Sequence, residues 1–299
     1  MKLVRFRHGR KEHYGIITDG KIVSVLLLAK TMNAKFPERL ENLIALGLDG
    51  VESVERLLKK TGQADVARAS YSSSEVTLLA PIPFPPKIIC LGLNYRDHAA
   101  ETNKPVPDEP VIFMKPRTAI IGPNESIIKP SFVKQLDYEA ELAIVVGRKA
   151  KNVSTSDARD YIFGYTILND VSARDIQFKD KQWTRGKGFD TFAPTGPSIT
   201  IVNQLLDTSN LKIKTWVNGE LRQNSTTRNM VFTVYEIVHQ LSRVMTLEPC
   251  DIIATGTPAG VGFAMKPQPK FLKAGDVVRI EIEKIGILEN IVVEKSQTS

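Results

Sequence analysis

Cysteine is scarce in this sequence: only Cys90 and Cys250 occur among 299 residues. Both lie in apolar segments, so we expect buried free thiols in a reducing compartment and no disulfide framework. No apolar run approaches the roughly 18 residues that a membrane-spanning helix requires. The basic N-terminus is not followed by the apolar segment of a secretory signal peptide. Together these absences argue against a secreted or membrane protein and favour a cytoplasmic one.

Several well-known functional signatures are also missing. No Cys/His cluster has the spacing of a zinc site, and there is no Gly-x-Ser-x-Gly nucleophile elbow. The glycine-rich segment 254–262 lacks the spacing of a nucleotide phosphate loop. The lysines and arginines are scattered without interleaved aromatic residues, so the net charge of +7 favours a solvated surface around an anion-attracting site. We therefore expect neither a nucleic-acid nor a membrane partner.

The composition and length are those of an ordinary globular protein. Hydrophobic residues make up 42% and charged residues 24% of the chain, whose length suits one large domain or two unequal ones. The proline-rich segment 81–86 favours extended chain and is a natural boundary. We therefore expect a small N-terminal module over residues 1–80 and a larger domain over residues 81–299.

The N-terminal module has an α/β pattern. Residues 13–25 read as two strands around an Asp-Gly turn, which is a strong hairpin signal. A first helix is expected to start near Pro37 and to be broken by Gly47 and Gly50. A second helix is expected over residues 51–58, where apolar residues share one face.

Beyond residue 86 the chain consists of short apolar runs rich in valine and isoleucine, separated by turn residues. This pattern predicts a mostly β architecture, as a sandwich, roll or barrel, within an α+β fold. Helices are few: residues 154–157 resemble a capping box that opens a short helix, and residues 233–247 carry an amphipathic stripe. The predicted strands cover residues 87–91, 111–114, 142–146, 165–168, 199–202, 213–217, 251–254 and 277–282.

Two acidic residues, Glu139 and Glu141, stand at the start of an apolar strand. Residues two apart in a strand point to the same face, so these carboxylates are expected to lie side by side. Next to a buried run they would repel each other and lose hydration, and a cation would offset both costs. The alternative is an exposed strand face that carries two acids by chance.

A third carboxylate, Asp170, ends another apolar strand. Sites on rigid scaffolds often lie at such strand ends. Three carboxylates would form a hard, all-oxygen site that suits Mg²⁺, Mn²⁺ or Ca²⁺ better than zinc. Three acids around one divalent ion leave an excess of one negative charge.

His98 and Glu101 are three residues apart, so on a helical turn they would be neighbours. A carboxylate beside an imidazole fixes its tautomer and supports it as a general base. The alternative is an exposed histidine in a loop. The prolines at 105, 107 and 110 suggest that this segment is mobile, as a lid would be.

Two further segments could contact a ligand. Lys187 lies between two glycines, which permits close approach of a small molecule. The glycine-rich turn 254–262, which contains Thr257, follows a predicted strand, and its backbone N–H groups could hold a carboxylate.

These motifs together resemble the fumarylacetoacetate hydrolase family, over about residues 87–287. The chain looks closer to the short acylpyruvate hydrolase and oxaloacetate decarboxylase-like members than to true fumarylacetoacetase, which is longer. The motifs that occur in the family's order are NYRDH at 94–98, DYEAE at 137–141, NDVSARD at 169–175, GKGFD at 186–190, VNGELRQ at 217–223 and TGTPAGVG at 255–262.

The resemblance implies a mixed β-sandwich roll, a homodimer and a lid-borne catalytic dyad that becomes ordered when ligand binds. It also implies Mg²⁺ or Mn²⁺ as the cofactor, with Ca²⁺ as a substitute, and a small 2-oxo acid as the substrate. The residues that it assigns are Glu139, Glu141 and Asp170 for the metal, His98, Glu101 and Lys187 for catalysis, and Arg174, Gln177, Lys187 and Thr257 for substrate binding.

The function expected first is cleavage of a C–C bond in a small 2-oxo acid, by acylpyruvate hydrolysis or oxaloacetate decarboxylation. Both reactions pass through a pyruvate enolate that the metal would stabilise as a Lewis acid. In hydrolysis, His98 supported by Glu101 would take a proton from water. One alternative is isomerisation or tautomerisation of a 2-hydroxymuconate-type diacid. Another, of a different class, is a non-catalytic binding or scaffold protein on the same fold.

Overall fold

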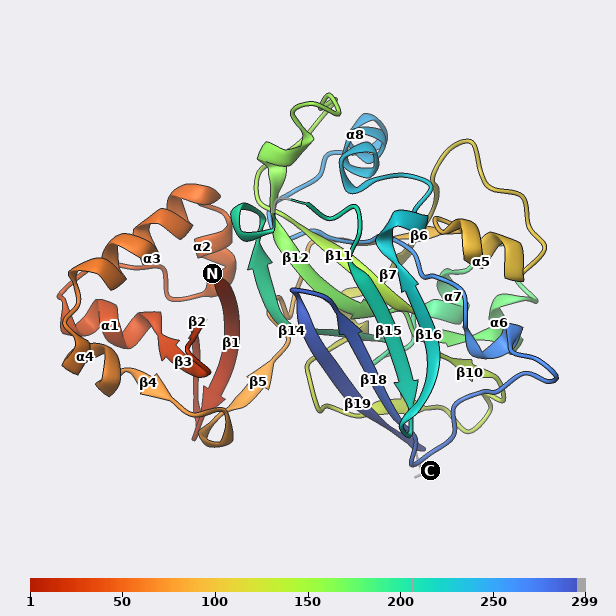
Figure 1. The fold of residues 1–299 in the computed structure, drawn as a ribbon, viewed down its shortest axis with the longest axis horizontal. Helices are drawn as coiled ribbons and strands as arrows, with labels where there is room; N and C mark the ends of the chain where they lie inside the picture. The colour runs from red at the N-terminus through yellow and green to blue at the C-terminus, as the bar shows by residue number, and fades with distance from the viewer. Residues whose placement is uncertain (206, 295–299) are drawn as a thin grey trace.

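The computed structural model describes residues 1–205 and 207–294. Strands form most of its regular structure, and helices lie over the N-terminal strands at the left, at the top and along the right side of the molecule as drawn (Figure 1). The predicted α+β, mostly β class is confirmed.

The largest sheet runs through both halves of the molecule. Its order in the described residues is β4-β3-β2-β1-β14-β12-β11-β17-β6-β7, with β5 paired to β1 and β8 to β14. Its strands are β1 (Lys2–His8), β2 (Lys11–Thr18), β3 (Lys21–Ser24), β4 (Ser70–Tyr71), β5 (Thr77–Leu79), β6 (Ile88–Gly92), β7 (Val111–Lys115), β8 (Ile120–Ile121), β11 (Ala140–Val146), β12 (Ile162–Asn169), β14 (Ala193–Ile201) and β17 (Ile252–Ala254).

A second sheet, of order β16-β15-β18-β19-β9, packs against β11, β12 and β14. It lies in front of them in Figure 1. A short pair, β10 with β13, lies beside the strands that carry the acids. These strands are β9 (Ile127–Lys129), β10 (Leu136–Asp137), β13 (Ser172–Ala173), β15 (Lys212–Val217), β16 (Glu220–Thr226), β18 (Val277–Ile282) and β19 (Gly286–Glu294).

Strand β11 is buried on both faces. Leu142 and Ile144 belong to the core beneath the second sheet. The alternating residues Ala143 and Val145 belong to the core on the other side, which includes the N-terminal helices. Burial on both faces explains why the strand reads as a continuous apolar run.

The helices are mostly short. The longest in the described residues are α3 (Leu48–Lys60), α8 (Val234–Val244) and α1 (Val25–Thr31). The other α-helices are α2 (Leu40–Ile44), α4 (Gln63–Arg68), α5 (Arg96–Glu101), α6 (Arg174–Gln177) and α7 (Thr184–Lys187), and the 3₁₀ turns are η1 (Ser73–Glu75), η2 (Arg117–Ala119), η3 (Ala158–Tyr161), η4 (Val202–Gln204), η5 (Thr227–Asn229) and η6 (Gly262–Ala264). No helix in the described ranges is long and apolar enough to cross a membrane.

Most N-terminal predictions are confirmed, and one is wrong. The hairpin forms as β2 and β3, and both predicted helices form as α2 and α3. Gly47, with φ +62°, does separate them. Gly50, however, lies inside α3, where a Cβ would come within 2.5 Å of the Leu43 carbonyl oxygen. It permits close packing of the two helices and does not end one.

The predicted strands beyond residue 86 all form, and so does helix α8, which begins after a capping box between Thr233 and Glu236. The helix predicted to open at residues 154–157 is wrong in position. The Ser154 hydroxyl accepts a hydrogen bond from the Asp157 N–H, which closes a turn, and the helical segment η3 begins only at Ala158.

The N-terminal strands extend the sheet that carries the acids. Lys2 pairs with Thr200 and Leu3 with Ile199, so β1 lies directly against β14. The division at residue 80 therefore separates two stretches of chain that share one sheet.

Candidate active site

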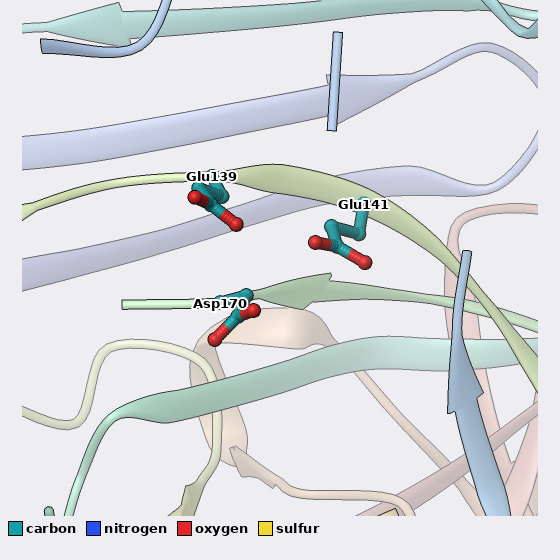
Figure 2. A group of neighbouring side chains, drawn as sticks. All are labelled: Glu139, Glu141 and Asp170. Atoms are coloured by element: carbon teal, nitrogen blue, oxygen red, sulfur yellow. The ribbon is translucent and has the colours of Figure 1, made fainter. Parts of the chain in front are cut away.

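Antiparallel pairing of β11 with β12 brings the three acidic residues together. Ala140 pairs with Asn169, so the residue before β11 lies next to the residue after β12. The Asp170 N–H donates to the Glu139 carbonyl oxygen (2.9 Å), and the Glu139 N–H donates to the Asn169 side chain (3.0 Å). Figure 2 shows the carboxyl groups of Glu139, Glu141 and Asp170 facing a common space between the strands.

This carboxylate trio is compact and buried. Each residue offers an oxygen within 4.8 Å of the others. Glu139 is 6% exposed, and Glu141 and Asp170 are 0% exposed, so the alternative of an exposed acidic strand face is wrong. The Gly256 N–H donates to Glu141 Oε2 (2.6 Å), whereas Oε1 of Glu141 is buried without a hydrogen-bond partner. An orphaned carboxylate oxygen facing two other acids fits a divalent cation.

The two glutamates differ in their electrostatics. Burial raises the pKa of Glu141 well above its usual range, and the neighbouring Asp170 and Glu139 carboxylates raise it further. Burial also acts to raise the pKa of Glu139, but Lys187 and Arg174 outweigh it and lower this pKa to about 2. Glu141 is therefore the acid in the trio that most lacks a positive partner.

Two buried lysines neutralise Asp170 from opposite sides. Lys187 Nζ lies 2.7 Å from both Glu139 Oε2 and Asp170 Oδ2. Lys115, at the end of β7, donates to Asp170 Oδ1 and to the Val171 carbonyl oxygen. We did not identify Lys115 from the sequence. The signal was present, because a lysine directly follows the apolar run 111–114 and so stands at a strand end.

Arg174 links the trio to a second group of side chains. Its Nη2 lies 2.7 Å from Glu139 Oε1, its Nε donates to Asp137 Oδ2 (2.8 Å), and its Nη1 donates to Gln177 Oε1 (2.9 Å). The neighbouring carboxylates raise the pKa of the guanidinium although burial opposes them. The two predicted substrate-binding residues Arg174 and Gln177 lie one turn apart on α6, and their side chains are hydrogen-bonded to each other.

Asp137 is a second residue that sequence analysis missed. It is fully buried, and besides holding Arg174 it accepts hydrogen bonds from the N–H groups of Gly262 (2.7 Å) and Phe263 (3.1 Å). The Phe263 ring lies 4.5 Å from the Arg174 guanidinium. Asp137 thus connects the arginine to the glycine-rich loop that follows β17.

The predicted dyad forms on α5. His98 Nδ1 lies 2.8 Å from Glu101 Oε1, and Glu101 Oε2 accepts a hydrogen bond from the Gly260 N–H (2.9 Å). His98 is 8% exposed, so the alternative of an exposed loop histidine is wrong. The helix is anchored at its start by Asp97, which accepts hydrogen bonds from Ser225 and Asn229. Nδ1 is committed to Glu101, which leaves Nε2 to meet a ligand.

One pocket collects most of the predicted site residues. His98, Glu139 and Thr257 line it together with the cations and aromatic rings around them. Glu141, Asp170 and Glu101 do not line it, although Asp170 and Glu101 contact the lining residues Lys187 and His98. The lining residues are Leu91, Gly92, Leu93, His98, Thr102, Lys104, Phe113, Glu139, Arg174, Gln177, Phe178, Trp183, Lys187, Thr257 and Phe263.

Comparison with known proteins defines the class. Residues 87–293 match the family model described as fumarylacetoacetate (FAA) hydrolase C-terminal, which covers more than half of the chain. The chain belongs to this family and is an enzyme of it, and the predicted resemblance is confirmed.

Individual relatives cover nearly the whole chain. The oxaloacetate tautomerase fahd2, mitochondrial, of Xenopus laevis is 46% identical over 98% of this chain and 90% of its own. A solved 5-carboxymethyl-2-hydroxymuconate delta-isomerase from Mycobacterium smegmatis is 38% identical, with a TM-score of 0.76, and covers 99% of this chain and 100% of its own. A maleylpyruvate hydrolase from Sphingobium sp. SYK-6, solved with manganese(II) and pyruvate, is 31% identical, with a TM-score of 0.79 and the same coverage.

Proposed function

We propose that the protein is a divalent-cation-dependent enzyme that interconverts the enol and keto forms of a small 2-oxo diacid such as oxaloacetate. The observation that carries this proposal is one pocket lined by His98 of the dyad, by Glu139 of the carboxylate trio and by the two buried cations Arg174 and Lys187. The likeness over 98% of the chain to a protein named oxaloacetate tautomerase supports the substrate and the reaction. Sequence analysis placed tautomerisation second, after C–C cleavage, and expected it for a 2-hydroxymuconate-type diacid, not for oxaloacetate.

The donor set suits Mg²⁺ or Mn²⁺, with Ca²⁺ as a substitute, held by Glu139, Glu141 and Asp170. When bound, the ion would supply Lewis-acid stabilisation of negative charge that develops on the 2-oxo oxygen. With Asp137, four carboxylates surround the site, against three cations: Lys115, Lys187 and Arg174. A divalent ion would bring this group to one net positive charge, which favours an anionic substrate.

The chain's own residues would bind the substrate and move the proton. Arg174 and Lys187 would orient the substrate carboxylate, with Gln177 and Thr257 as further hydrogen-bonding groups. His98 Nε2 would remove a proton from C3 of the keto form, and the 2-oxygen of the resulting enolate would take up a proton from water. In the reverse direction the enol O–H would lose its proton to water, and the protonated His98 would return one to C3. Glu101 would hold the imidazole in the required tautomer and stabilise its protonated form.

C–C cleavage is the second candidate, because the same dyad could deprotonate a water molecule that attacks a 4-oxo group. The likeness to a maleylpyruvate hydrolase solved with manganese(II) and pyruvate favours it. Decarboxylation of oxaloacetate could use the same three carboxylates, because loss of CO₂ from C3 leaves a pyruvate enolate, as hydrolysis of an acylpyruvate does. A non-catalytic scaffold is disfavoured by the complete dyad and trio. The homodimer and the cytoplasmic location remain predictions, and the X. laevis relative is named as mitochondrial.

A substrate panel tests the proposal. Purified protein would be assayed in EDTA, Mg²⁺ or Mn²⁺ with enol-oxaloacetate, keto-oxaloacetate, acetylpyruvate and maleylpyruvate. We expect cation-dependent loss of enol absorbance, and at least about a 100-fold lower rate in His98→Ala, since general-base help is worth about 10²–10⁴-fold. Cleavage products at a higher kcat/KM than tautomerisation would replace the first candidate with the second. Inactivity on all four substrates with either cation would refute both.

A further inference from the structure

The pocket has one lining cation that no acid neutralises. Among its lining residues, Arg174 is paired with Asp137 and Glu139, and Lys187 with Glu139 and Asp170. Lys104 has no carboxylate partner within the described residues. Its ammonium instead lies 5.8 Å from the centre of the Trp183 ring. An unpaired cation in the pocket is free to bind an anionic group of the ligand.

Lys104 lies at the solvent-facing end of the pocket. Its side chain is exposed, whereas Lys187 is 2% exposed. The rings of Trp183 and Phe113 are 5.5 Å apart, and Lys187 Nζ lies 5.0 Å from the Phe113 ring. Gly92 makes room for the indole, because a Cβ there would lie 2.2 Å from it. Two aromatic rings thus form a wall between a buried cation and an exposed one.

The backbone of Lys104 is hydrogen-bonded to the helix that carries the dyad. It follows the end of α5, and its N–H donates to the Ala99 carbonyl oxygen (3.0 Å) at the centre of that helix. A group that binds Lys104 therefore contacts the same short segment that carries His98.

We propose that Lys104 binds the distal carboxylate of a dicarboxylic 2-oxo acid and thereby selects diacids over monoacids. This inference rests on the proposed function, in which the trio, Arg174 and Lys187 take the 2-oxo acid end of the substrate. With that end fixed in the buried part of the pocket, a second carboxylate has to lie toward its mouth. Lys104 is the lining cation there, and its stacking on Trp183 limits the freedom of the side chain.

The test compares a diacid with a monoacid that shares its 2-oxo acid end. In Lys104→Met, the KM for enol-oxaloacetate is expected to rise roughly fivefold, as for loss of one exposed charge-assisted contact, with kcat nearly unchanged. The inhibition constant of pyruvate, which has no distal carboxylate, should not change. Lys104→Arg should retain most of the affinity. Lys181→Met serves as the matched control, because Lys181 is exposed and does not line the pocket.

Equal shifts for oxaloacetate and pyruvate, or no shift for either, would overturn the assignment of Lys104. An inactive wild-type protein would count against the proposed function alone. In that case, calorimetric binding of oxaloacetate and pyruvate to the Mn²⁺-loaded wild type and Lys104→Met proteins decides the role of Lys104 without turnover. Loss of oxaloacetate affinity alone supports it, and parallel affinities refute it.

Discussion

Asp170 shows how a single buried carboxylate depends on its neighbours. Lys115 approaches one of its oxygens and Lys187 the other, and all three side chains are at most 2% exposed. Each lysine offsets part of the cost of burying the acid. A divalent cation at the trio would supply a further positive partner for the same carboxylate. The stability contributed by Lys115 should therefore depend on whether that cation is present.

Replacing Lys115 with Met tests this dependence. In EDTA the change should lower the free energy of unfolding, by about 3 kcal/mol, since it leaves one oxygen of a buried carboxylate without its cation while Lys187 still pairs with the other. Mn²⁺ should recover part of that loss. Denaturant unfolding with and without Mn²⁺ would measure both values.

Lys87→Met is the matched control. Lys87 Nζ lies 2.8 Å from Asp251, a buried acid outside the trio, so the loss there should be the same with and without Mn²⁺. An Mn²⁺-independent loss in Lys115→Met would show that no cation approaches Asp170.

At the scale of secondary-structure elements, the site combines a rigid part with a short tethered helix. The trio sits on paired strands buried on both faces. The dyad sits on α5, whose last residue, Glu101, is held by the N–H of Gly260. Gly260 has φ +102°, and a Cβ there would lie 2.2 Å from the Arg222 carbonyl oxygen. The loop can present its N–H to Glu101 only because this residue is glycine.

Gly260→Ala should therefore damage activity as well as stability. We expect kcat to fall at least about tenfold, because the dyad loses its support. Gly219→Ala separates this effect from backbone strain: Gly219 has φ +81° but open space around it, so it should lose only about 1–2 kcal/mol of stability and keep its activity. Steady-state kinetics and thermal unfolding of both variants would show the contrast. Similar activities in the two variants would contradict the supporting role of the loop.

Local signals predicted much of the fold and most of the site. Strands of alternating or continuous apolar residues, and motif residues at their ends, were readable from neighbouring positions. For Lys115 the local signal was its place at a strand end, but its pairing with Asp170, 55 positions away, is not visible in the sequence. The pairing of Asp137 with Arg174, 37 positions away, is not visible there either. Helix α1 was missed because its run Val-Leu-Leu-Leu follows a strand directly and is too short to show a helical period.

At the scale of the whole molecule, the N-terminal stretch and the rest share one core. Leu3 and Leu28 from the first 80 residues belong to the same buried cluster as Ile88, Ile199 and Ile252. Two independently folding units would each need a core of their own. The division at residue 80 remains a proposal. It separates two kinds of sequence pattern, but the residues on its two sides pack into one core.

A single unfolding transition is the expected consequence. Calorimetry should show one cooperative peak for the full chain, and a protein that starts at Pro81 should unfold at a lower temperature, because the edge of β14 and the shared core lose their cover. Two resolved transitions, with the second unchanged in the shortened protein, would instead support independent modules.

The separation of the trio from α5 has a consequence for inheritance within the family. The strands that hold the carboxylates belong to a core buried on both faces, whereas α5 and the residues up to Lys104 form a short segment in which only His98 and Ala99 are buried. Proteins descended from one ancestor could therefore keep the same binding site for the 2-oxo acid end of the substrate and differ only in the amino acids of this segment. Tautomerases, isomerases and hydrolases could then diverge through a stretch of fewer than a dozen residues.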